Sequence, residues 1–262
     1  MIKLSANISM LFTEDPFLRR IKRCADNGFA GIEFLFPYEF KIEEIKEKIE
    51  KFNIKIVLHN LPAGKWESGE RGIACHPDRI EEFKNGVDLA IKYANALNVK
   101  QLNCLSGIKP ADLDEQIALD TLIDNLKYAA GKLKEHNIKL LVEPINNYDI
   151  PGFILNSTKR AIQIMDLVGS DNIFLQYDVY HAQRMEGEIL GNIKKYFDRI
   201  AHIQIADNPG RNEPGTGEIN YKNIFKFLNN QNYQGWVGCE YKPEKETAVG
   251  LSWIDSHGLS HK

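Results

Sequence analysis

Residues 235–243, GWVGCEYKP, form a short apolar segment that ends on the carboxylate of Glu240. A short apolar segment with small, β-branched and aromatic residues predicts a buried β-strand. A buried charge is unfavourable unless it is paired or bound to a cation. The interpretation of Glu240 therefore depends on what the rest of the chain places beside it.

Seven further segments of the same kind precede this one, and longer amphipathic stretches separate them. The seven are KLSANIS (3–9), AGIEFLF (30–36), IKIVLHN (54–60), VKQLNCL (99–105), KLLVEPI (139–145), IFLQYDV (173–179) and AHIQIAD (201–207). Among the amphipathic stretches, residues 16–28 start with Pro16 and end with Gly28, as helices often do. Residues 42–53 carry apolar side chains at helical spacing. The alternation is typical of strand–helix units around a parallel sheet.

Eight such units in 262 residues predict an α/β fold, a (β/α)₈ TIM barrel, because that fold takes about 250 residues. The alternative is an open, doubly wound sheet. That fold carries a glycine-rich turn after its first strand, and residues 5–12, SANISMLF, contain no glycine. No linker or low-complexity segment interrupts the chain, so we expect a single domain over residues 1–262.

The composition bears on partners and location. The formal net charge is −3, which offers no basic surface for a nucleic-acid backbone. No apolar run approaches the roughly 20 residues that span a bilayer, and the first 16 residues do not resemble a signal peptide. The four cysteines are scattered without a C-x-x-C pair, which speaks against disulfides and a thiolate zinc site. We expect a cytoplasmic protein without nucleic-acid or membrane partners.

Four consecutive predicted strands carry an oxygen-bearing side chain near their carboxyl ends. These residues are Glu143, Asp178, Gln204 and Glu240, separated by 26 to 36 residues. In a TIM barrel these strand ends open into the active site, so the four side chains would converge there. Three carboxylates and one amide oxygen form a hard ligand set that suits Mg²⁺ or Mn²⁺ better than Zn²⁺. The alternative is structural, with Gln204 in a hydrogen-bond network and the acids paired with Lys or Arg.

Other polar residues are expected at the same mouth. His59 and Asn103 end the third and fourth predicted strands, His181 follows the sixth, and Arg211 lies in the loop after the seventh. The planar guanidinium of Arg211 would match a substrate carboxylate. Each of the four side chains could instead be structural or solvent-exposed.

The segment of residues 61–78, LPAGKWESGERGIACHPD, is longer than usual for a strand–helix connection and contains three glycines. Long glycine-bearing loops over an active site often act as lids. Arg71 and Lys65 are therefore candidates for binding a substrate carboxylate, although charged surface loops are common.

The sequence resembles the hydroxypyruvate isomerases, members of the xylose-isomerase-like barrel superfamily. The resemblance runs through LHNLPAG (58–64), GERGIAC (69–75), EPINNYDIPGF (143–153), QYDVYHAQRMEGE (176–188) and the opening segment GWVGCEYKP. It implies a divalent metal, Mg²⁺ or Mn²⁺, held by Glu143, Asp178, Gln204 and Glu240, with Glu143 and Glu240 also transferring the proton. In related sugar isomerases and epimerases, a histidine at the place of His181 contacts a substrate oxygen.

The implied reaction interconverts hydroxypyruvate and 2-hydroxy-3-oxopropanoate (tartronate semialdehyde), so the expected partner is a small 2-oxo acid. A proton leaves C3 and another reaches C2 through an enediolate; a hydride shift is the mechanistic alternative. The 2-oxo-tetronate isomerases are similar at the same four positions. A metal-dependent ketose 3-epimerase, a zinc endonuclease of the same fold and a barrel that only binds a ligand are further alternatives.

The C-terminal residues 252–262, SWIDSHGLSHK, leave the quaternary structure open. This tail would lie in solvent, pack across the barrel, or pack against a second subunit in a homo-oligomer.

Overall fold

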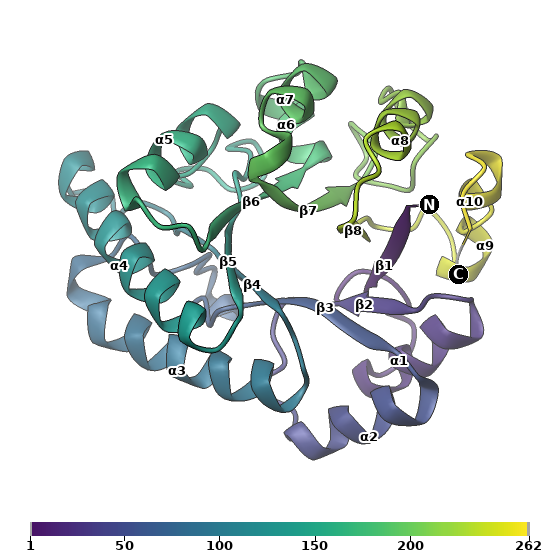
Figure 1. Ribbon diagram of the computed structural model, residues 1–262, viewed down its shortest axis with the longest axis horizontal. Coiled ribbons are helices and arrows are strands. Elements are labelled where there is room, and N and C mark those ends of the chain that lie inside the picture. Colours follow the sequence, from purple (N-terminus) through teal and green to yellow (C-terminus); the bar gives the residue numbers. More distant parts are fainter. Residues whose placement is uncertain (1, 261–262) are drawn as a thin grey trace.

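The computed structural model describes residues 2–260 and contains eight parallel strands closed into one barrel (Figure 1). The strands are β1 (Lys3–Asn7), β2 (Gly31–Glu33), β3 (Lys55–Asn60), β4 (Gln101–Cys104), β5 (Lys139–Val142), β6 (Ile173–Asp178), β7 (Ile200–Ile205) and β8 (Trp236–Cys239). Each strand pairs with the next, and β8 pairs with β1. Each lies within or across one of the eight predicted segments, which confirms the (β/α)₈ barrel.

Helices form an outer ring around the strands (Figure 1). The α-helices are α1 (Phe17–Asp26), α2 (Ile42–Phe52), α3 (Ile80–Ala96), α4 (Glu115–Glu135), α5 (Thr158–Val168), α6 (Val179–Met185), α7 (Ile189–Lys195), α8 (Tyr221–Asn230), α9 (Thr247–Gly250) and α10 (Trp253–Ser256). Short 3₁₀ turns are η1 (Trp66–Ser68), η2 (Pro77–Arg79) and η3 (Phe197–Arg199). Both helices expected from residues 16–28 and 42–53 are present.

Two glycines make room inside the barrel. A Cβ on Gly31 would lie 2.6 Å from the ring of Trp236, and a Cβ on Gly238 would lie 2.3 Å from a carboxylate oxygen of Glu33. No side chain can occupy these positions without displacing its neighbour. The interior therefore accommodates one large ring near the start of β8 and one buried carboxylate at the end of β2.

The long connection after β3 packs against the barrel. It contains η1 and η2, and Gly72 within it adopts a φ of +113°. A Cβ on Gly72 would lie 2.2 Å from the carbonyl oxygen of Leu105, so only glycine permits this close approach. The contact fixes the loop beside the carboxyl end of β4.

The C-terminal tail packs on the barrel. Ile254 is fully buried in α10, and Trp253 is 5% exposed and donates a hydrogen bond from Nε1 to the hydroxyl of Tyr241 at 3.0 Å. The described part of the tail thus covers the barrel beside β8, and residues 261–262 lie outside the described part of the chain. The four cysteines are buried and free, as the sequence predicted.

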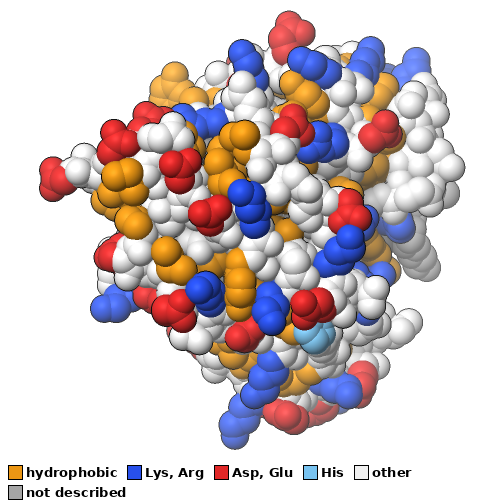
Figure 2. Space-filling view, turned by 60° about the vertical axis from the view of Figure 1, so that its left-hand side comes forward, with side chains coloured by type: hydrophobic (Ala, Val, Ile, Leu, Met, Phe, Trp, Pro, Cys, Tyr) orange, Lys and Arg blue, Asp and Glu red, His pale blue; other side chains and the backbone are white. Residues whose placement is uncertain are grey.

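The outer surface is mixed in charge on the face that Figure 2 shows. Acidic and basic side chains alternate there with apolar ones, and no large patch of one sign is visible on this face. Within residues 2–260, no helix is both long enough and apolar enough to cross a membrane.

Candidate active site

A cavity of about 530 Å³ opens at the carboxyl ends of the strands, where a TIM barrel carries its active site. Its lining includes Arg71, Glu143, His181, Arg211, Glu240 and Lys242. A second cavity of about 600 Å³ lies beside it, and both are lined by Leu35 and Trp66. Glu143 and Glu240 line the first cavity, which is therefore the candidate active site; Asp178 and Gln204 are not among its lining residues.

On the β5–β6 side of this cavity, two acids are held by neighbouring donors. Glu143 directly follows β5, and its Oε2 accepts a hydrogen bond of 2.8 Å from Nδ2 of Asn103. Asp178 ends β6 and caps α6, because its Oδ1 accepts from the backbone N–H groups of Tyr180 (2.7 Å) and His181 (3.3 Å). The other oxygen, Oδ2, is buried and has no hydrogen-bond partner among the described residues. Asp178 is thus held by hydrogen bonds at one oxygen, whereas the other lies 3.7 Å from Nε2 of His181 and 3.8 Å from Nη2 of Arg211, beyond hydrogen-bond distance.

His181 is held as a neutral imidazole with its hydrogen on Nε2. The Nδ2 of Asn146 lies 2.6 Å from Nδ1 of His181, and Oδ1 of Asn146 accepts from the backbone N–H of Asp149 at 2.8 Å. The second contact fixes the orientation of the amide, so Nδ1 of His181 is an acceptor and Nε2 carries the hydrogen. Burial, together with the charges of Arg211 and Arg184, keeps the pKa of His181 well below its ordinary value.

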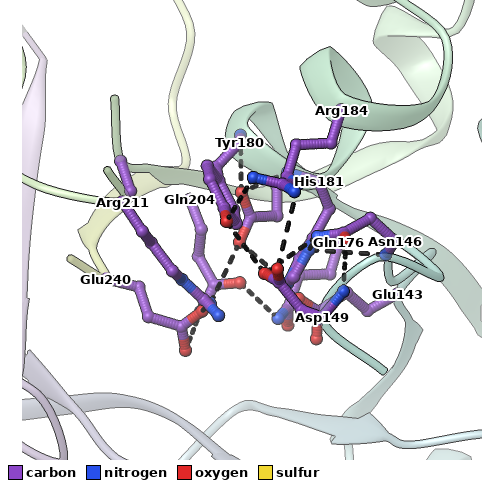
Figure 3. A network of polar contacts seen from close by, with 12 residues as sticks. Glu143, Asn146, Asp149, Gln176, Tyr180, His181, Arg184, Gln204, Arg211 and Glu240 are labelled. Atoms are coloured by element: carbon purple, nitrogen blue, oxygen red, sulfur yellow. Dashed lines mark hydrogen bonds and ion pairs between the residues drawn. The ribbon is translucent and has the colours of Figure 1, made fainter. Parts of the chain in front are cut away.

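On the β7–β8 side, the polar atoms are bonded to one another (Figure 3). Gln204 donates from Nε2 to Glu33 at 2.8 Å and to Glu240 at 3.2 Å, and its Oε1 accepts from Gln176 at 2.6 Å. Asn7 donates to Oε1 of Glu240 at 2.8 Å. These contacts fix Gln204 and Glu240 from within the protein.

Arg211 connects the two sides. Its Nη2 lies 2.8 Å from Oε2 of Glu240 and 3.8 Å from Oδ2 of Asp178 (Figure 3). Its guanidinium also lies over the ring of Tyr180, 5.1 Å from the centroid. The arginine therefore compensates part of the negative charge that the strand ends bring together.

One guanidinium does not neutralise three buried carboxyls. Burial, with the nearby charges of Glu240 and Asp178, raises the pKa of Glu143 well above its ordinary value. Burial also raises the pKa of Asp178, although Arg211 opposes the shift. For Glu240, burial outweighs the opposing effect of Arg211 and raises the pKa to about 8. The site retains protons near neutral pH unless a further cation enters it.

Three side chains offer ligand atoms within 4.8 Å of one another: Glu143, Asp178 and His181. The hydrogen on Nε2 makes His181 a donor in its neutral form, so the two acids are the better ligands of this group. The unpartnered Oδ2 of Asp178 fits a cation. Gln204 also fits, because its carbonyl oxygen retains a lone pair beside the bond from Gln176. The hard oxygen donors at this mouth suit Mg²⁺ or Mn²⁺.

The remaining predicted residues lie at different depths. Arg71 lines the cavity and stacks on Trp66, with 4.0 Å between its guanidinium carbon and the ring centroid. Asn103 is fully buried and contacts Glu143 rather than the cavity. His59 is fully buried beside the ring of Tyr38, and the next residue, Asn60, lines the cavity instead.

Sequence reasoning missed several polar residues of the site. Asn7 and Glu33 end β1 and β2, but they lie inside the predicted segments KLSANIS and AGIEFLF, so the sequence did not mark them as strand-end residues. Gln176 alternates with Asp178 along β6, so the period of two would have placed both on one face. Asn146 gave no such signal, because its role depends on the position of His181.

Comparison with known proteins places the chain among barrel enzymes. The family model described as "Xylose isomerase-like TIM barrel" matches residues 21–257. The chain is 52% identical over 257 residues to "Hydroxypyruvate isomerase" of Escherichia coli (strain K12), covering 98% of this chain and 100% of the relative. It is 42% identical to "2-oxo-tetronate isomerase" of Pectobacterium atrosepticum, covering 97% of each chain.

Solved structures agree on the fold. A structure titled as an AP endonuclease of family 2 from Brucella melitensis is 42% identical and superposes with a TM-score of 0.95, covering 98% of this chain and 99% of that one. A D-psicose 3-epimerase from Clostridium cellulolyticum H10 has a TM-score of 0.80 at 18% identity, covering 98% and 100%. The second likeness concerns the fold alone.

Proposed function

We propose that this chain, which belongs to the xylose isomerase-like TIM barrel family and is an isomerase, interconverts hydroxypyruvate and 2-hydroxy-3-oxopropanoate (tartronate semialdehyde). The observation that carries the proposal is the pair of buried glutamates at one cavity, Glu143 after β5 and Glu240 after β8. The relative from E. coli, 52% identical over nearly the whole chain, supports the substrate.

The reaction moves a carbonyl by one carbon. A base removes a proton from C3 of hydroxypyruvate, which leaves an enediolate, and an acid returns a proton to C2, while the hydroxyl proton passes between the oxygens on C3 and C2. Two carboxyl groups on different sides of the substrate can serve as this base and acid. Burial raises the pKa of Glu143 and, to about 8, that of Glu240 in the metal-free chain, which favours proton retention; a metal held by both carboxylates would lower their basicity again.

Four side chains would hold a divalent metal, Mg²⁺ or Mn²⁺, at this mouth. They are Glu143, Asp178, Gln204 and Glu240. When bound, the metal stabilises negative charge on the substrate oxygens as a Lewis acid. The unpartnered Oδ2 of Asp178 supports this assignment.

Cationic and donor groups around the cavity favour an acid as substrate. Arg71, Arg211 and Lys242 line it, and the hydrogen on Nε2 of His181 provides a donor for a substrate oxygen. A neutral ketose would need hydroxyl contacts and no cation for a carboxylate. This difference supports a 2-oxo acid over the substrate of a ketose 3-epimerase.

The test is NMR spectroscopy of the purified protein with hydroxypyruvate in D₂O, after chelation and with Mg²⁺ or Mn²⁺ restored. We expect metal-stimulated formation of tartronate semialdehyde that carries solvent deuterium, and loss of turnover in Glu143→Gln and Glu240→Gln. Isomerisation without deuterium would favour the hydride shift or a shielded proton. Absence of turnover by the metal-loaded protein would contradict the substrate.

A 2-oxo-tetronate isomerase is the second candidate. The relative from Pectobacterium atrosepticum supports it, and the cavity of about 600 Å³ beyond Leu35 and Trp66 would accommodate a fourth carbon. The comparison of kcat/KM for the three-carbon and four-carbon acids separates the two. Endonuclease activity is disfavoured, because the net charge of −3 offers no general attraction to a nucleic acid.

A further inference from the structure

Glu33 is a buried carboxylate beneath the proposed metal site. It ends β2, is 0% exposed, and occupies space that Gly238 on β8 leaves open. A Cβ on Gly238 would lie 2.3 and 2.4 Å from the two carboxylate oxygens. The barrel interior is thus shaped for an acid at position 33, although an apolar side chain would fill the same space without the desolvation that a charge requires.

The polar groups around Glu33 are ones that can donate a hydrogen bond to a carboxylate oxygen. Oε1 accepts from Nε2 of Gln204 at 2.8 Å and more weakly from Nδ2 of Asn7 at 3.5 Å. Oε2 accepts from the hydroxyl of Ser5 at 2.8 Å and lies 2.9 Å from Nε2 of His202. The link to Gln204 joins residues 171 positions apart in the chain.

The contact decides which end of the Gln204 amide points toward β6, the strand that carries Gln176 and Asp178. A glutamine amide has an oxygen and an NH₂ group of nearly equal size, and only the oxygen can bind a cation. Glu33 and Glu240 accept from Nε2, whereas Gln176 of β6 donates to Oε1. If the amide were reversed, oxygen would face two carboxylates and NH₂ would face NH₂.

We propose that Glu33 is a positioning residue of the metal site: it holds Nε2 of Gln204 so that the amide oxygen points toward the β6 side of the site, where Asp178 lies. The inference rests on the proposed function, in which Gln204 is a metal ligand. Glu33 itself would not touch the metal or the substrate. Residues that orient ligands in this way typically change metal affinity about 10- to 100-fold when they are replaced.

The experiment is a double-mutant cycle between positions 33 and 204, with Mn²⁺ affinity measured by isothermal titration calorimetry and melting temperature measured in parallel. Glu33→Leu removes the acceptor with little change in volume. In the Gln204→Glu background both terminal atoms of side chain 204 are oxygens, so its orientation no longer matters for metal binding. There the carboxylate of Glu33 only repels the carboxylate of residue 204.

We expect Glu33→Leu to weaken Mn²⁺ binding at least tenfold when residue 204 is glutamine, and to leave it equal or tighter when residue 204 is glutamate. Equal losses in both backgrounds, or no loss in either, would overturn the role of Glu33. If Glu33→Leu does not fold, Glu33→Gln is measured by the same criterion. Ser5→Ala is the matched control: it removes a partner of Glu33 but leaves the contact with Gln204, so Mn²⁺ affinity should stay within about twofold.

The outcome also separates this inference from the proposed function. If the unmodified protein binds no Mn²⁺, the metal site itself is wrong, and the positioning role falls with it. If the unmodified protein binds Mn²⁺ and the cycle shows no coupling, only the role of Glu33 is wrong.

Discussion

The carboxyl and amide oxygens on the two sides of the cavity differ in how completely they are bonded. On the β5–β6 side, Oδ2 of Asp178 and Oδ1 of Asn103 are buried without hydrogen-bond partners among residues 2–260. On the β7–β8 side, both ends of Gln204 and both oxygens of Glu240 have partners, including Arg211. One side is ready to accept a ligand, whereas the other is held in place by the protein.

The difference indicates that the two sides of the site have different roles. Buried acceptors without donors are rare in folded proteins, and each needs an explanation such as an ion or a ligand. Saturated groups, in contrast, keep their geometry before any ligand arrives. The comparison predicts that substitutions on the first side mainly affect chemistry and that substitutions on the second side also affect the stability of the metal-free protein.

The largest effect is expected from Glu143→Gln on the open side. Loss of a proton-transferring group lowers kcat by about 10²- to 10⁴-fold. The metal-free protein should be at least as stable as before, because a neutral amide replaces a carboxyl whose pKa is raised by burial. Steady-state kinetics test the expected fall in kcat. Urea unfolding in the presence of a chelator tests the expected stability of the metal-free protein. A kcat within tenfold of the unmodified protein would contradict the catalytic role.

Arg211→Leu, on the β7–β8 side, should have the next largest effect. It removes the cation that contacts Glu240 and Asp178, so the free energy of unfolding without metal should fall by about 3 kcal/mol at pH 9. At pH 6 the loss should be smaller, because the carboxyls then retain protons. Added Mn²⁺ should restore part of the stability.

The control for this variant is Arg199→Leu, in the exposed pair with Asp166, which should cost no more than about 1 kcal/mol. Equal losses for Arg199→Leu and Arg211→Leu would show that the cavity pair has no special role.

A smaller effect is expected in how the stability of the metal-free protein depends on pH. The pKa of Glu240 rises to about 8 in the folded chain from an ordinary 4.5. Between these values the folded state holds more protons than the unfolded state, so stability falls as pH rises. Urea unfolding of the metal-free protein from pH 5 to 9 should show this decline; Glu240 alone contributes a slope of up to about 1.4 kcal/mol per pH unit, and the raised pKa values of Glu143 and Asp178 add to it. Glu240→Gln should reduce the slope by up to about 1.4 kcal/mol per pH unit; an unchanged slope would assign the decline to other groups.

The smallest effect is expected from Asn146→Leu. This variant removes the side-chain donor at 2.6 Å from Nδ1 of His181 and leaves only the backbone N–H of residue 146 at 3.4 Å, so the hydrogen is held less firmly on Nε2. We expect about a tenfold drop in kcat/KM. Nitrogen-15 NMR of the imidazole should show a protonated Nε2 in the unmodified protein and a mixture in the variant. Asn147→Leu is the matched neighbour, and an equal drop there would contradict the specific role of Asn146.

The sequence predicted the eight strands because the signal is local. Apolar segments of strand length alternate with helical periodicity, and each segment reports its own state. Boundaries were less accurate: AGIEFLF predicts a strand to Phe36, whereas β2 ends at Glu33. Two residues later, the backbone N–H of Leu35 donates to the hydroxyl of Ser9, a side chain that the segment itself does not contain.

The gathering of Glu143, Asp178, Gln204 and Glu240 at one mouth also followed from the sequence, because barrel topology directs the ends of all strands to the same face. Their partners did not follow from it. Arg211 beside Glu240, Glu33 beneath Gln204 and Asn146 behind His181 are contacts between residues 29, 171 and 35 positions apart. Only closure of the barrel brings such residues within hydrogen-bond distance, so the tertiary structure alone decided which polar atoms are held and which remain free for a ligand.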